Sequence, residues 1–367
     1  MKQPFIKILL SLFIICFITS CNVLKRVNDN EQLLVQNILL IDGEKEKSED
    51  INSLIYQQPN NKLFLGIPLR LHIYNLAREN RDSLFEAWLN ENPKRKERLI
   101  KRYSKKQVDK LKESSLGFNN WLKKTGEAPV IIDTLRANKS KRNFEKYYFN
   151  NGWFNREVSY SIDSVGKNRA SITYRVDRKA PYIIDSLSTK IASPIIDSLY
   201  QSNKLNSIVK TGNQFKDIDE TNERERLTTI FRNSGVYHFS QDRIWFNNDS
   251  IFADKSVDVE LEIINRTIRN EDSVAHVPFK IYKIKEVNII TDETALNQGD
   301  VFSDSIVFKN YNLFSHDKMR YRPKAIANAI FINKGNVFSD LDRTRTYRYL
   351  NNLQIFKYPN IEYIENP

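Results

Sequence analysis

The sequence predicts an α+β protein built from tandem modules, each running strand, helix, helix, strand, strand. The prediction depends on one pattern that occurs three times. In the first copy Phe144, Tyr147 and Tyr148 stand at i, i+3 and i+4, which is one face of a helix. Asn150-Asn151-Gly152 then stops that helix, because glycine enters the left-handed C-terminal conformation without steric cost. An alternating strand follows and runs through Ile162.

The pattern recurs at the same internal offsets further along the chain. Shifted by 83 residues, it gives a second helix face and a stop at Asn233-Ser234-Gly235. A further 119 residues on, Thr346, Tyr349 and Leu350 form the third face. Asn352-Leu353-Gln354 follows as a stop that has lost its glycine. Repetition on this scale indicates an array of small modules.

The composition is that of a folded protein with an anionic neighbour. The chain has 367 residues, of which 40% are hydrophobic, enough for two or three domains with real cores. Its formal charge is +12 and its isoelectric point is near 9.4. Nucleic acid, lipid headgroups and acidic proteins are the anions that such a charge attracts.

The N-terminus indicates export. Lys2 and Lys7 precede an apolar run from Ile8 to Ile18, which is short for a membrane span and typical of a signal peptide. Thr19-Ser20-Cys21 then resembles a bacterial lipoprotein signal, which implies removal of residues 1–20 and acylation of Cys21. An uncleaved N-terminal anchor is the alternative.

The residues around this cysteine indicate the compartment. Position 22 is Asn22 and not the Asp that retains many lipoproteins at the inner membrane, so the resemblance implies the outer membrane. No acidic run follows Cys21, so we expect the chain to face the periplasm. Because Cys16 falls in the removable segment, the mature protein cannot form an internal disulfide. Outside the cytoplasm, nucleic acid is not an expected ligand.

The first module is predicted over residues 32–178, after a tether over 21–31. Leu33–Ile41 has the pattern of a buried strand. Ser48 to Tyr56 is predicted to be a short helix with acidic residues at its positive end. A basic helical insertion is predicted over about 60–128.

The insertion carries most of the charge. Leu84, Phe85, Trp88 and Leu89 have amphipathic helical spacing. From Lys94 to Lys124 there are twelve Lys or Arg against three acidic residues. Such runs are commonly solvated faces, and the alternative is a docking surface for anionic headgroups or an acidic partner. The residues predicted for that surface are Lys94, Arg95, Lys101, Arg102, Lys105 and Lys106.

The first module closes with a hairpin. Its strands are predicted around Val158–Ile162 and Ala170–Val176, with a turn at Asp163–Gly166. The second module is predicted over 179–268 and opens with a strand over Tyr182–Ile191.

The second module continues with two helices and a hairpin. Pro194 suits the first turn of a helix, and Asp219 is predicted to cap the second helix. The closing strands are predicted at Ile244–Phe246 and Val257–Ile263, joined across Asn247–Asp249.

The third module is predicted over 279–367. A strand at Ile281–Ile290, a loop at Thr291–Arg322 and a helix from Pro323 are expected. The octet Gly335–Asp342 matches Gly212–Asp219 at its Gly, Asn, Phe and Asp positions. Sequence for the last strand of this module is lacking, so we expect it to be incomplete at its C-terminus.

These motifs resemble those of the POTRA domain. The Gly-x-x-Phe loop before the second helix, the Asn-x-Gly-aromatic stop after it and Arg322-Pro323-Lys324 resemble the periplasmic part of BamA and TamA-type outer-membrane assembly factors. Together with the lipoprotein start, they especially resemble a lipid-anchored TamA variant (TamL-like). The resemblance implies an elongated array of mixed three-stranded sheets, each with two helices on one face. The basic insertion and the third stop depart from it.

The resemblance also implies partners. Such factors continue into a membrane β-barrel, so we expect this chain to be a piece of a longer protein; a natural short form is the alternative. The implied partners are lipid through acylated Cys21, its own or a separate β-barrel, unfolded outer-membrane protein clients and a TamB-like periplasm-spanning protein.

The implied activity is β-augmentation, in which an extended client adds a strand to an open sheet edge. In POTRA domains the last strand is central, which leaves the first hairpin strand at the edge. The predicted client-binding residues are Val158, Tyr160 and Ile162 in the first module, and Arg243 and Trp245 in the second.

No enzyme site is predicted. The four histidines, His72, His238, His276 and His316, lack metal-ligand spacing, and no phosphate-binding or nucleophile motif is present. The acidic pairs before the second helices suit capping better than catalysis. No cofactor or metal is therefore expected. The competing functions are a lipoprotein that binds or hydrolyses a small ligand, and a POTRA scaffold of another envelope complex.

Overall fold

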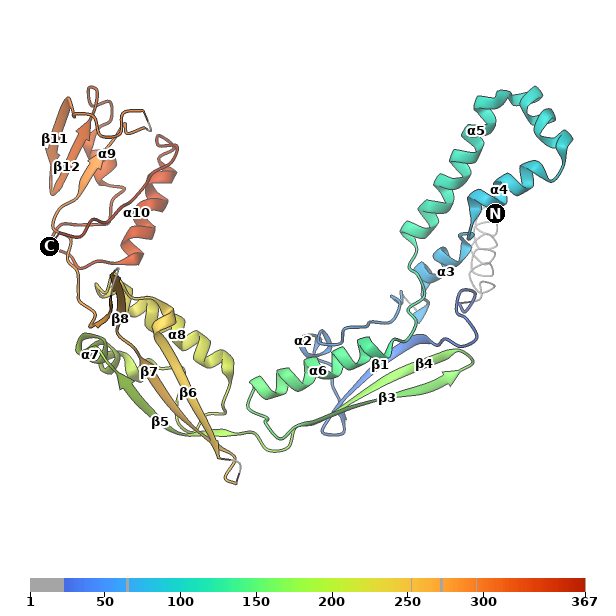
Figure 1. Ribbon diagram of the computed structural model, residues 1–367, viewed down its shortest axis with the longest axis horizontal. Helices are drawn as coiled ribbons and strands as arrows, with labels where there is room; N and C mark the ends of the chain where they lie inside the picture. Colours follow the sequence, from blue (N-terminus) through green and yellow to red (C-terminus); the bar gives the residue numbers. More distant parts are fainter. Residues whose placement is uncertain (1–22, 64–65, 252, 271–272, 295, 367) are drawn as a thin grey trace, which may run out of the picture. The chain divides into compact units, whose positions relative to one another are not determined.

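The protein has an α+β fold with several small mixed sheets (Figure 1). The computed structural model describes residues 23–63, 66–251, 253–270, 273–294 and 296–366. The predicted signal peptide and Cys21 lie outside the described residues. The chain divides into two compact units, the first comprising 1–149 and 153–179 and the second 150–152 and 180–367.

Unit 1 contains one sheet, one long helix against it and a separate group of helices. Its elements are β1 (Leu33–Ile41), β2 (Glu44–Lys45), α2 (Glu49–Asn52), α3 (Leu69–Leu76), α4 (Arg81–Asn90), α5 (Pro93–Thr125), α6 (Thr134–Asn150), β3 (Glu157–Gly166) and β4 (Arg169–Asp177).

The sheet of unit 1 has the order β2-β1-β4-β3. β1 runs parallel to β4, and β3 runs antiparallel to β4. This confirms the expectation that the last strand of the module is central and that the first hairpin strand lies outside it. β1 occupies the residues predicted for it.

The core of unit 1 lies between this sheet and α6. Ile172, Tyr174 and Val176 alternate along β4 and are almost fully buried, as a strand with one face on a core requires. Phe144 and Tyr148 of α6 meet them, and the ring centroids of Phe144 and Tyr174 are 5.6 Å apart. The predicted helix face is therefore the core face.

The predicted helix over Ser48–Tyr56 is wrong in length. Only α2 is helical there, and the chain after it is irregular. The Asn143 Nδ2 group donates to Leu54 O at 2.8 Å, and Ser140 Oγ accepts from the backbone N–H of Tyr56 at 2.9 Å. These bonds from α6 satisfy backbone groups that a longer helix would have paired internally.

The insertion forms three helices, α3, α4 and α5. α4 covers the residues predicted to be an amphipathic helix, of which Leu89 is buried. α5 covers the whole basic run, with a kink at Ser104, where φ is 61°.

Unit 2 begins with a second sheet and two helices. The elements are β5 (Ile183–Ile191), α7 (Pro194–Asn203), η2 (Lys204–Asn206), α8 (Asp217–Asn233), η3 (Gln241–Arg243), β6 (Ile244–Ile251) and β7 (Ser256–Ile263). The sheet order is β5-β7-β6, with β5 parallel and β6 antiparallel to β7. Pro194 stands in the first turn of α7, as predicted.

The core of this second sheet lies between the sheet and two helices, α7 and α8. Every second residue of β7 is buried, and α7 and α8 contribute Ile196, Leu227 and Phe231. The first two modules thus share strand order, strand direction and the placement of their cores.

Both hairpins are longer than predicted. β3 continues through the predicted turn to Gly166, and Asn168 makes the reversal at φ 51°. β6 continues through Asn247–Asp249 to Ile251. Each strand lies at the edge of its sheet, where one face and one side meet solvent, so polar residues do not end it.

The rest of unit 2 contains two further sheets. The elements are β8 (Arg266–Asn270), β9 (Ser273–Val277), β10 (Asn288–Ile290), β11 (Asp304–Phe308), β12 (Tyr311–Ser315), α9 (Pro323–Ala327) and α10 (Asp340–Asn352). β8 and β9 form a hairpin that no pattern predicted.

The third predicted module differs most from expectation. Its opening strand is only β10, and the predicted loop at Thr291–Arg322 contains the β11-β12 hairpin. These strands make a sheet of order β10-β12-β11, and all three precede the helices α9 and α10 in the chain. The alternation of Tyr311, Leu313 and Ser315, all buried, was the signal that sequence reading missed.

The three helix stops have the same backbone conformation. Gly152 and Gly235 have φ of 86° and 98°, and Gln354 has φ of 54°. Each residue stands two positions after the last residue of its helix. The third copy therefore keeps the left-handed stop without glycine.

The predicted capping role of Asp219 is wrong. α8 begins at Asp217, so both acidic residues lie in its first turn, where they complement the positive end of the helix dipole. In α10 the cap is Ser339, whose Oγ accepts from the backbone N–H of Asp342 at 3.2 Å.

The repeated Gly-Asn-x-Phe loop contacts the preceding helix stop. Tyr282 N donates to Gly235 O at 2.8 Å, and Phe338 N donates to Tyr282 O at 2.9 Å. The same two bonds link Gly152, Tyr182 and Phe215, at 2.8 Å and 3.0 Å. We call each set a three-segment joint, since it ties a helix stop, a following extended segment and a loop.

Candidate interaction site

The outer side of β3 is an open strand edge. Among the described residues, β3 pairs with β4 and with no other strand. The direction of its backbone groups follows from the other side of β4, where Asp42 N donates to Val176 O at 2.8 Å. The backbone N–H and C=O groups of Val176 thus point toward β1, and those of the residues on either side of it in β4 point toward β3.

This fixes which residues of β3 face outward. Residues opposite each other in an antiparallel pair alternate between bonded and non-bonded pairs. Ser159 and Ser161 are opposite Arg175 and Thr173, so they make the bonded pairs. The N–H and C=O groups of the residues between them point away from the sheet. These residues are Val158, Tyr160 and Ile162, the ones predicted from the sequence.

The side chains of these three residues face the core of unit 1. A partner strand at this edge would therefore meet the outward backbone groups of β3. The side chains of Ser159, Ser161 and Asp163 lie on the face of the sheet opposite to the core.

β6 presents the second open edge. Ile264 N donates to Arg243 O at 3.1 Å. The backbone carbonyl of Arg243, and the backbone groups of every second residue after it, therefore point toward β7. The residues between them point outward, namely Ile244, Phe246, Asn248 and Ser250. The first outward carbonyl, that of Ile244, already accepts from Arg224 Nε at 3.3 Å. The available part of this edge runs from Phe246 to Ser250.

Two side chains of α8 stand over this edge. Arg224 lies over the ring of Phe246, 5.1 Å from its centroid. Glu220 accepts from Asn248 Nδ2 at 2.7 Å and is 3.6 Å from the guanidinium of Arg224. Burial raises the pKa of Glu220, an effect that the bond from Asn248 and the charge of Arg224 only partly offset. An ionisable pair therefore borders the β6 edge.

The structure places Arg243 and Trp245 differently from the other predicted residues. Arg243 ends η3, and its Nη1 donates to Thr267 Oγ1 at 2.9 Å. Trp245 lies in β6, but its backbone groups point toward β7 and its side chain is 54% exposed. Neither residue can offer free backbone groups to a client. Alternate residues of a strand direct their backbone groups to opposite sides, and the sequence alone does not show which set faces the neighbouring strand.

The six predicted basic residues all lie on α5. Five are exposed, and Arg95 is half-buried. Arg95 Nη1 is 3.0 Å from Glu91 Oε2, and its guanidinium lies 5.0 Å from the ring centroid of Trp88. Arg95 is thus engaged within the insertion and is the least available of the six.

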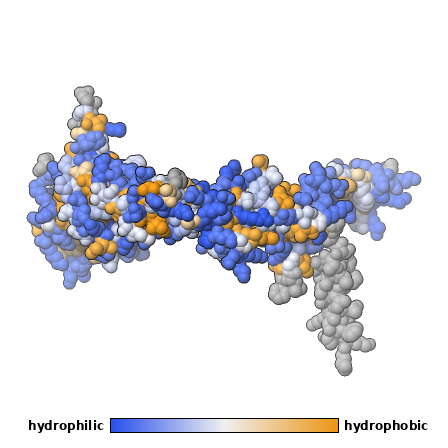
Figure 2. Space-filling view, turned by 90° about the horizontal axis from the view of Figure 1, so that it is seen from below, coloured by the Kyte–Doolittle hydropathy of each residue, from blue (hydrophilic) through white to orange (hydrophobic). Residues whose placement is uncertain are grey.

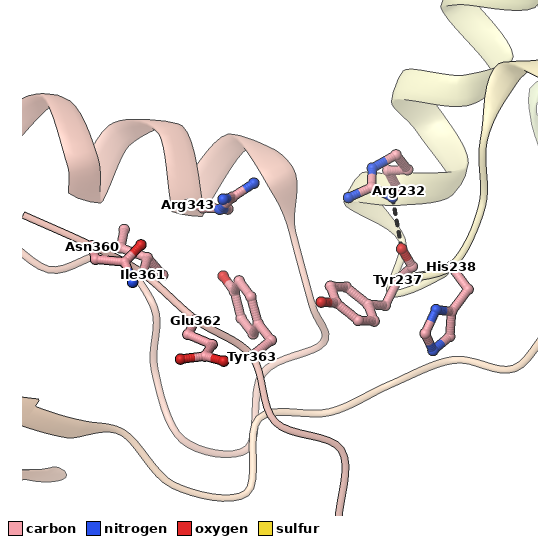
Figure 3. Close-up of a pocket in the computed structure, with 8 residues that line it drawn as sticks. All are labelled: Arg232, Tyr237, His238, Arg343, Asn360, Ile361, Glu362 and Tyr363. Atoms are coloured by element: carbon pink, nitrogen blue, oxygen red, sulfur yellow. Dashed lines mark hydrogen bonds between the residues drawn. The ribbon is translucent and has the colours of Figure 1, made fainter. Parts of the chain in front are cut away.

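A polar hollow of about 510 Å³ lies within unit 2 (Figure 3). Arg232 extends from α8 toward Tyr237, whose carbonyl accepts from its Nη1 at 2.6 Å. Burial raises the pKa of Tyr363 to about 12. The lining residues are Arg232, Tyr237, His238, Arg343, Asn360, Ile361, Glu362 and Tyr363. The walls contain one carboxylate, so they do not form the paired-carboxylate site that a glycan-hydrolysing function would need.

Within the part of the chain that the structure describes, no group of three or more His, Cys, Asp or Glu could hold a metal ion. The histidines have other neighbours. His316 Nδ1 lies 3.2 Å from Asp292 Oδ1, and His238 contacts Glu365. In the described part of the chain, no helix combines the length and the apolar composition that a membrane span requires.

Comparisons with known proteins find similarity only among solved structures. Neither a protein-family model nor a curated protein matches the chain. The structure of BamA POTRA3-5 from Haemophilus influenzae has a TM-score of 0.33 and 10% identity, covering 90% of each chain. POTRA1-3 of Omp85 from Anabaena has a TM-score of 0.24 and 8% identity, covering 89% of this chain and 87% of that one.

A third similar structure is the N-terminal domain of Omp85 from Thermosynechococcus elongatus. Its TM-score is 0.21 at 14% identity, with coverage of 63% of this chain and 77% of that one. The fold described above is defined by strand order and direction within each sheet, independently of these similarities.

Proposed function

We propose that this chain is a non-enzymatic interaction module that binds extended segments of other proteins by β-augmentation. The observation that carries the proposal is the pair of open edges on β3 and β6, where alternate backbone groups point away from the sheet. Unpaired N–H and C=O groups in a row are a template for another strand.

The chemistry of these edges favours recognition of backbone over side chain. The outward residues of β3 pack their side chains against the core, so an added strand would bond through backbone atoms that every client possesses. This mode suits a module that handles many different unfolded chains. It needs no cofactor.

The proposed setting is the periplasmic face of the outer membrane, with the chain anchored through acylated Cys21. The proposed clients are unfolded outer-membrane proteins, delivered to a membrane β-barrel, with a TamB-like protein as a further partner. The lipoprotein motif and the POTRA-like motifs of the sequence support this setting. Mass spectrometry of the mature N-terminus will show whether Cys21 is acylated.

Binding at β6 can be tested by removing one outward N–H. Asn248→Pro eliminates that donor, and because Asn248 lies between bonded pairs the β6-β7 ladder keeps its bonds. We expect affinity for a ten-residue peptide from a strand of an outer-membrane protein to fall at least about fivefold, from the loss of a bond worth ~1 kcal/mol. The measurement is calorimetric titration with the chain from Asn22 to Pro367, which keeps every described residue.

The matched control is Asn248→Ala, which removes the side-chain bond to Glu220 and keeps the backbone N–H. It should bind like the unaltered chain. Hydrogen exchange should show peptide-dependent protection of the outward amides on β3 or β6. Equal loss in both variants, or protection at neither edge, would contradict β-augmentation here.

A further inference from the structure

Helix α5 exposes an apolar stripe that no part of the described chain covers. Leu111, Phe118 and Trp121 are 53%, 62% and 54% exposed. Their spacing of seven and three residues puts them on one side of the helix. The rings of Phe118 and Trp121 stack with centroids 5.8 Å apart. Large apolar side chains gathered in this way indicate a contact surface.

Lysines border this stripe. At 100° per residue, Lys106, Lys110 and Lys124 fall on the flank beside Trp121, and all three are exposed. The other flank faces the insertion itself, where Val108 and Leu122 are buried. One side of α5 thus packs against the protein, the next exposes the apolar side chains, and the next has three lysines against one exposed carboxylate, that of Glu113. In Figure 2 hydrophobic residues likewise reach the surface in separate patches among hydrophilic ones.

The start of the described chain is tied to the same group of helices. Lys25 Nζ donates to Asn75 O at 2.7 Å, and Arg26 Nη2 donates to Ala77 O at 2.6 Å. These carbonyls lie at the end of α3. The next residue, Arg78, is joined to Asn119 of α5 by two hydrogen bonds, of 2.7 Å and 3.0 Å. Asn119 is adjacent in sequence to Phe118.

We propose that this side of α5 binds the surface of a bilayer containing anionic phospholipids, with Phe118 and Trp121 at the headgroup boundary and Lys106, Lys110 and Lys124 on the phosphates. An amphipathic helix with an aromatic face and a lysine border has the character of an interfacial helix. Each lysine near an anionic leaflet adds to the attraction.

The position of the stripe favours a membrane over an acidic protein. The predicted acylation site, Cys21, precedes Lys25 by four residues, a span of at most ~14 Å of extended chain. An acyl chain at that point would hold the end of α3, and with it α5, beside the bilayer. Two weak attachments acting together give stable anchoring where one does not.

The test uses the non-acylated chain from Asn22 to Pro367 and vesicles of phosphatidylcholine with or without about 30% phosphatidylglycerol, which supplies the anionic headgroups. We expect flotation with the anionic vesicles only. Phe118→Ser with Trp121→Ser, and separately Lys106→Glu with Lys110→Glu and Lys124→Glu, should each lower the bound fraction roughly tenfold.

Matched controls lie on unit 2. Leu205→Ser removes an 85% exposed leucine, and Lys204→Glu with Lys210→Glu and Lys285→Glu reverses three exposed charges. These variants should float like the unaltered chain. Trp121→Phe should still float but lose the vesicle-dependent blue shift of tryptophan emission. Failure of the unaltered chain to float, or equal losses in controls and α5 variants, would overturn the proposal. Binding to soluble polyglutamate that matches the vesicle binding and survives Phe118→Ser with Trp121→Ser would also overturn it, in favour of an acidic protein partner.

Discussion

Gly152 illustrates how one residue can serve two requirements. Its φ of 86° lies in the left-handed region, and an added Cβ would stand 2.5 Å from Phe215 O. Gly43 has nearly the same φ, 87°, but an added Cβ there would meet nothing within 4 Å. A comparison of the same substitution at the two positions therefore distinguishes the cost of backbone strain from the cost of the steric contact.

We expect Gly43→Ala to cost about 1–2 kcal/mol, the penalty for an L residue in the left-handed region. Gly152→Ala should cost roughly 1–3 kcal/mol more, because Phe215 or the helix stop must move. Urea denaturation of both variants will compare them. Equal losses would show that the contact with Phe215 is easily relieved.

Glu220 gives a pH-dependent signature. Since burial raises its folded-state pKa above the unfolded value, the native chain retains a proton that the unfolded chain releases. The stability that this proton contributes is present at low pH and is lost as pH rises through the folded-state pKa. Glu220→Gln cannot ionise and should keep a hydrogen bond with Asn248.

The variant should therefore be more stable than the unaltered chain at pH 8, and the difference should vanish near pH 4. Urea denaturation across this range is the measurement. Glu225→Gln, an exposed change on the same helix, is the control and should show no such trend. A constant difference at every pH would contradict the expectation.

At the scale of elements, Arg232 links α8 to α10. Its Nη2 donates to Asp340 Oδ1 at 2.9 Å, and its Nη1 donates to the carbonyls of Tyr237 and Phe239 at 2.6 Å and 2.9 Å. It also lies 5.3 Å from the ring centroid of Phe338 in the repeated loop. The hydrogen bond that Arg232 donates to Asp340, and the negative charge of that carboxylate, raise the pKa of Arg232.

Arg232→Ala should lower the stability of unit 2 by about 2 kcal/mol, since it removes a charge-assisted pair and leaves two carbonyls without this donor. Arg320→Ala is the matched control, because its pair with Asp317 at 3.2 Å is exposed on both sides. It should cost at most about 0.5 kcal/mol. Differential scanning calorimetry will separate them, and similar shifts would mean that the Arg232 pair is as weak as a surface pair.

The two edge strands show why element boundaries are hard to predict. Polar runs such as Asn247–Asp249 look like turns, yet at a sheet edge they lie within β6. Conversely, the β11-β12 hairpin lay inside a stretch predicted to be a loop. The local sequence pattern shows which residues alternate, whereas pairing with a neighbouring strand determines where a strand begins and ends.

For the whole molecule, the positive charge belongs mainly to the insertion. Lys94 to Lys124 carries twelve Lys or Arg and three acidic residues, a balance of +9 against +12 for the entire chain. The remainder of the chain, which includes both sheets with open edges, carries a balance of only +3. The basic helix α5 and the open strand edges consist of different residues. Membrane binding and β-augmentation can therefore be tested independently.

The sequence by itself determined the repeated unit. Helical periodicity located α6, α8 and α10, with glycine stops after the first two. A buried apolar run located β1, and alternation located β4 and β7, because each pattern depends on residues close together in the chain. Alternation also predicted the strand that contains Val158, Tyr160 and Ile162, and the resemblance to POTRA domains implied that this strand lies at an edge.

Only the tertiary structure decided what the patterns do together. The Gly-Asn-x-Phe loops and the helix stops are partners in the three-segment joints, through bonds between residues far apart in sequence. The direction of each backbone group on β6, the exclusion of Arg243 and Trp245 from its free edge, and the apolar stripe of α5 likewise follow from register and burial. Such relations are set by which segments meet in space, and no local pattern contains that information.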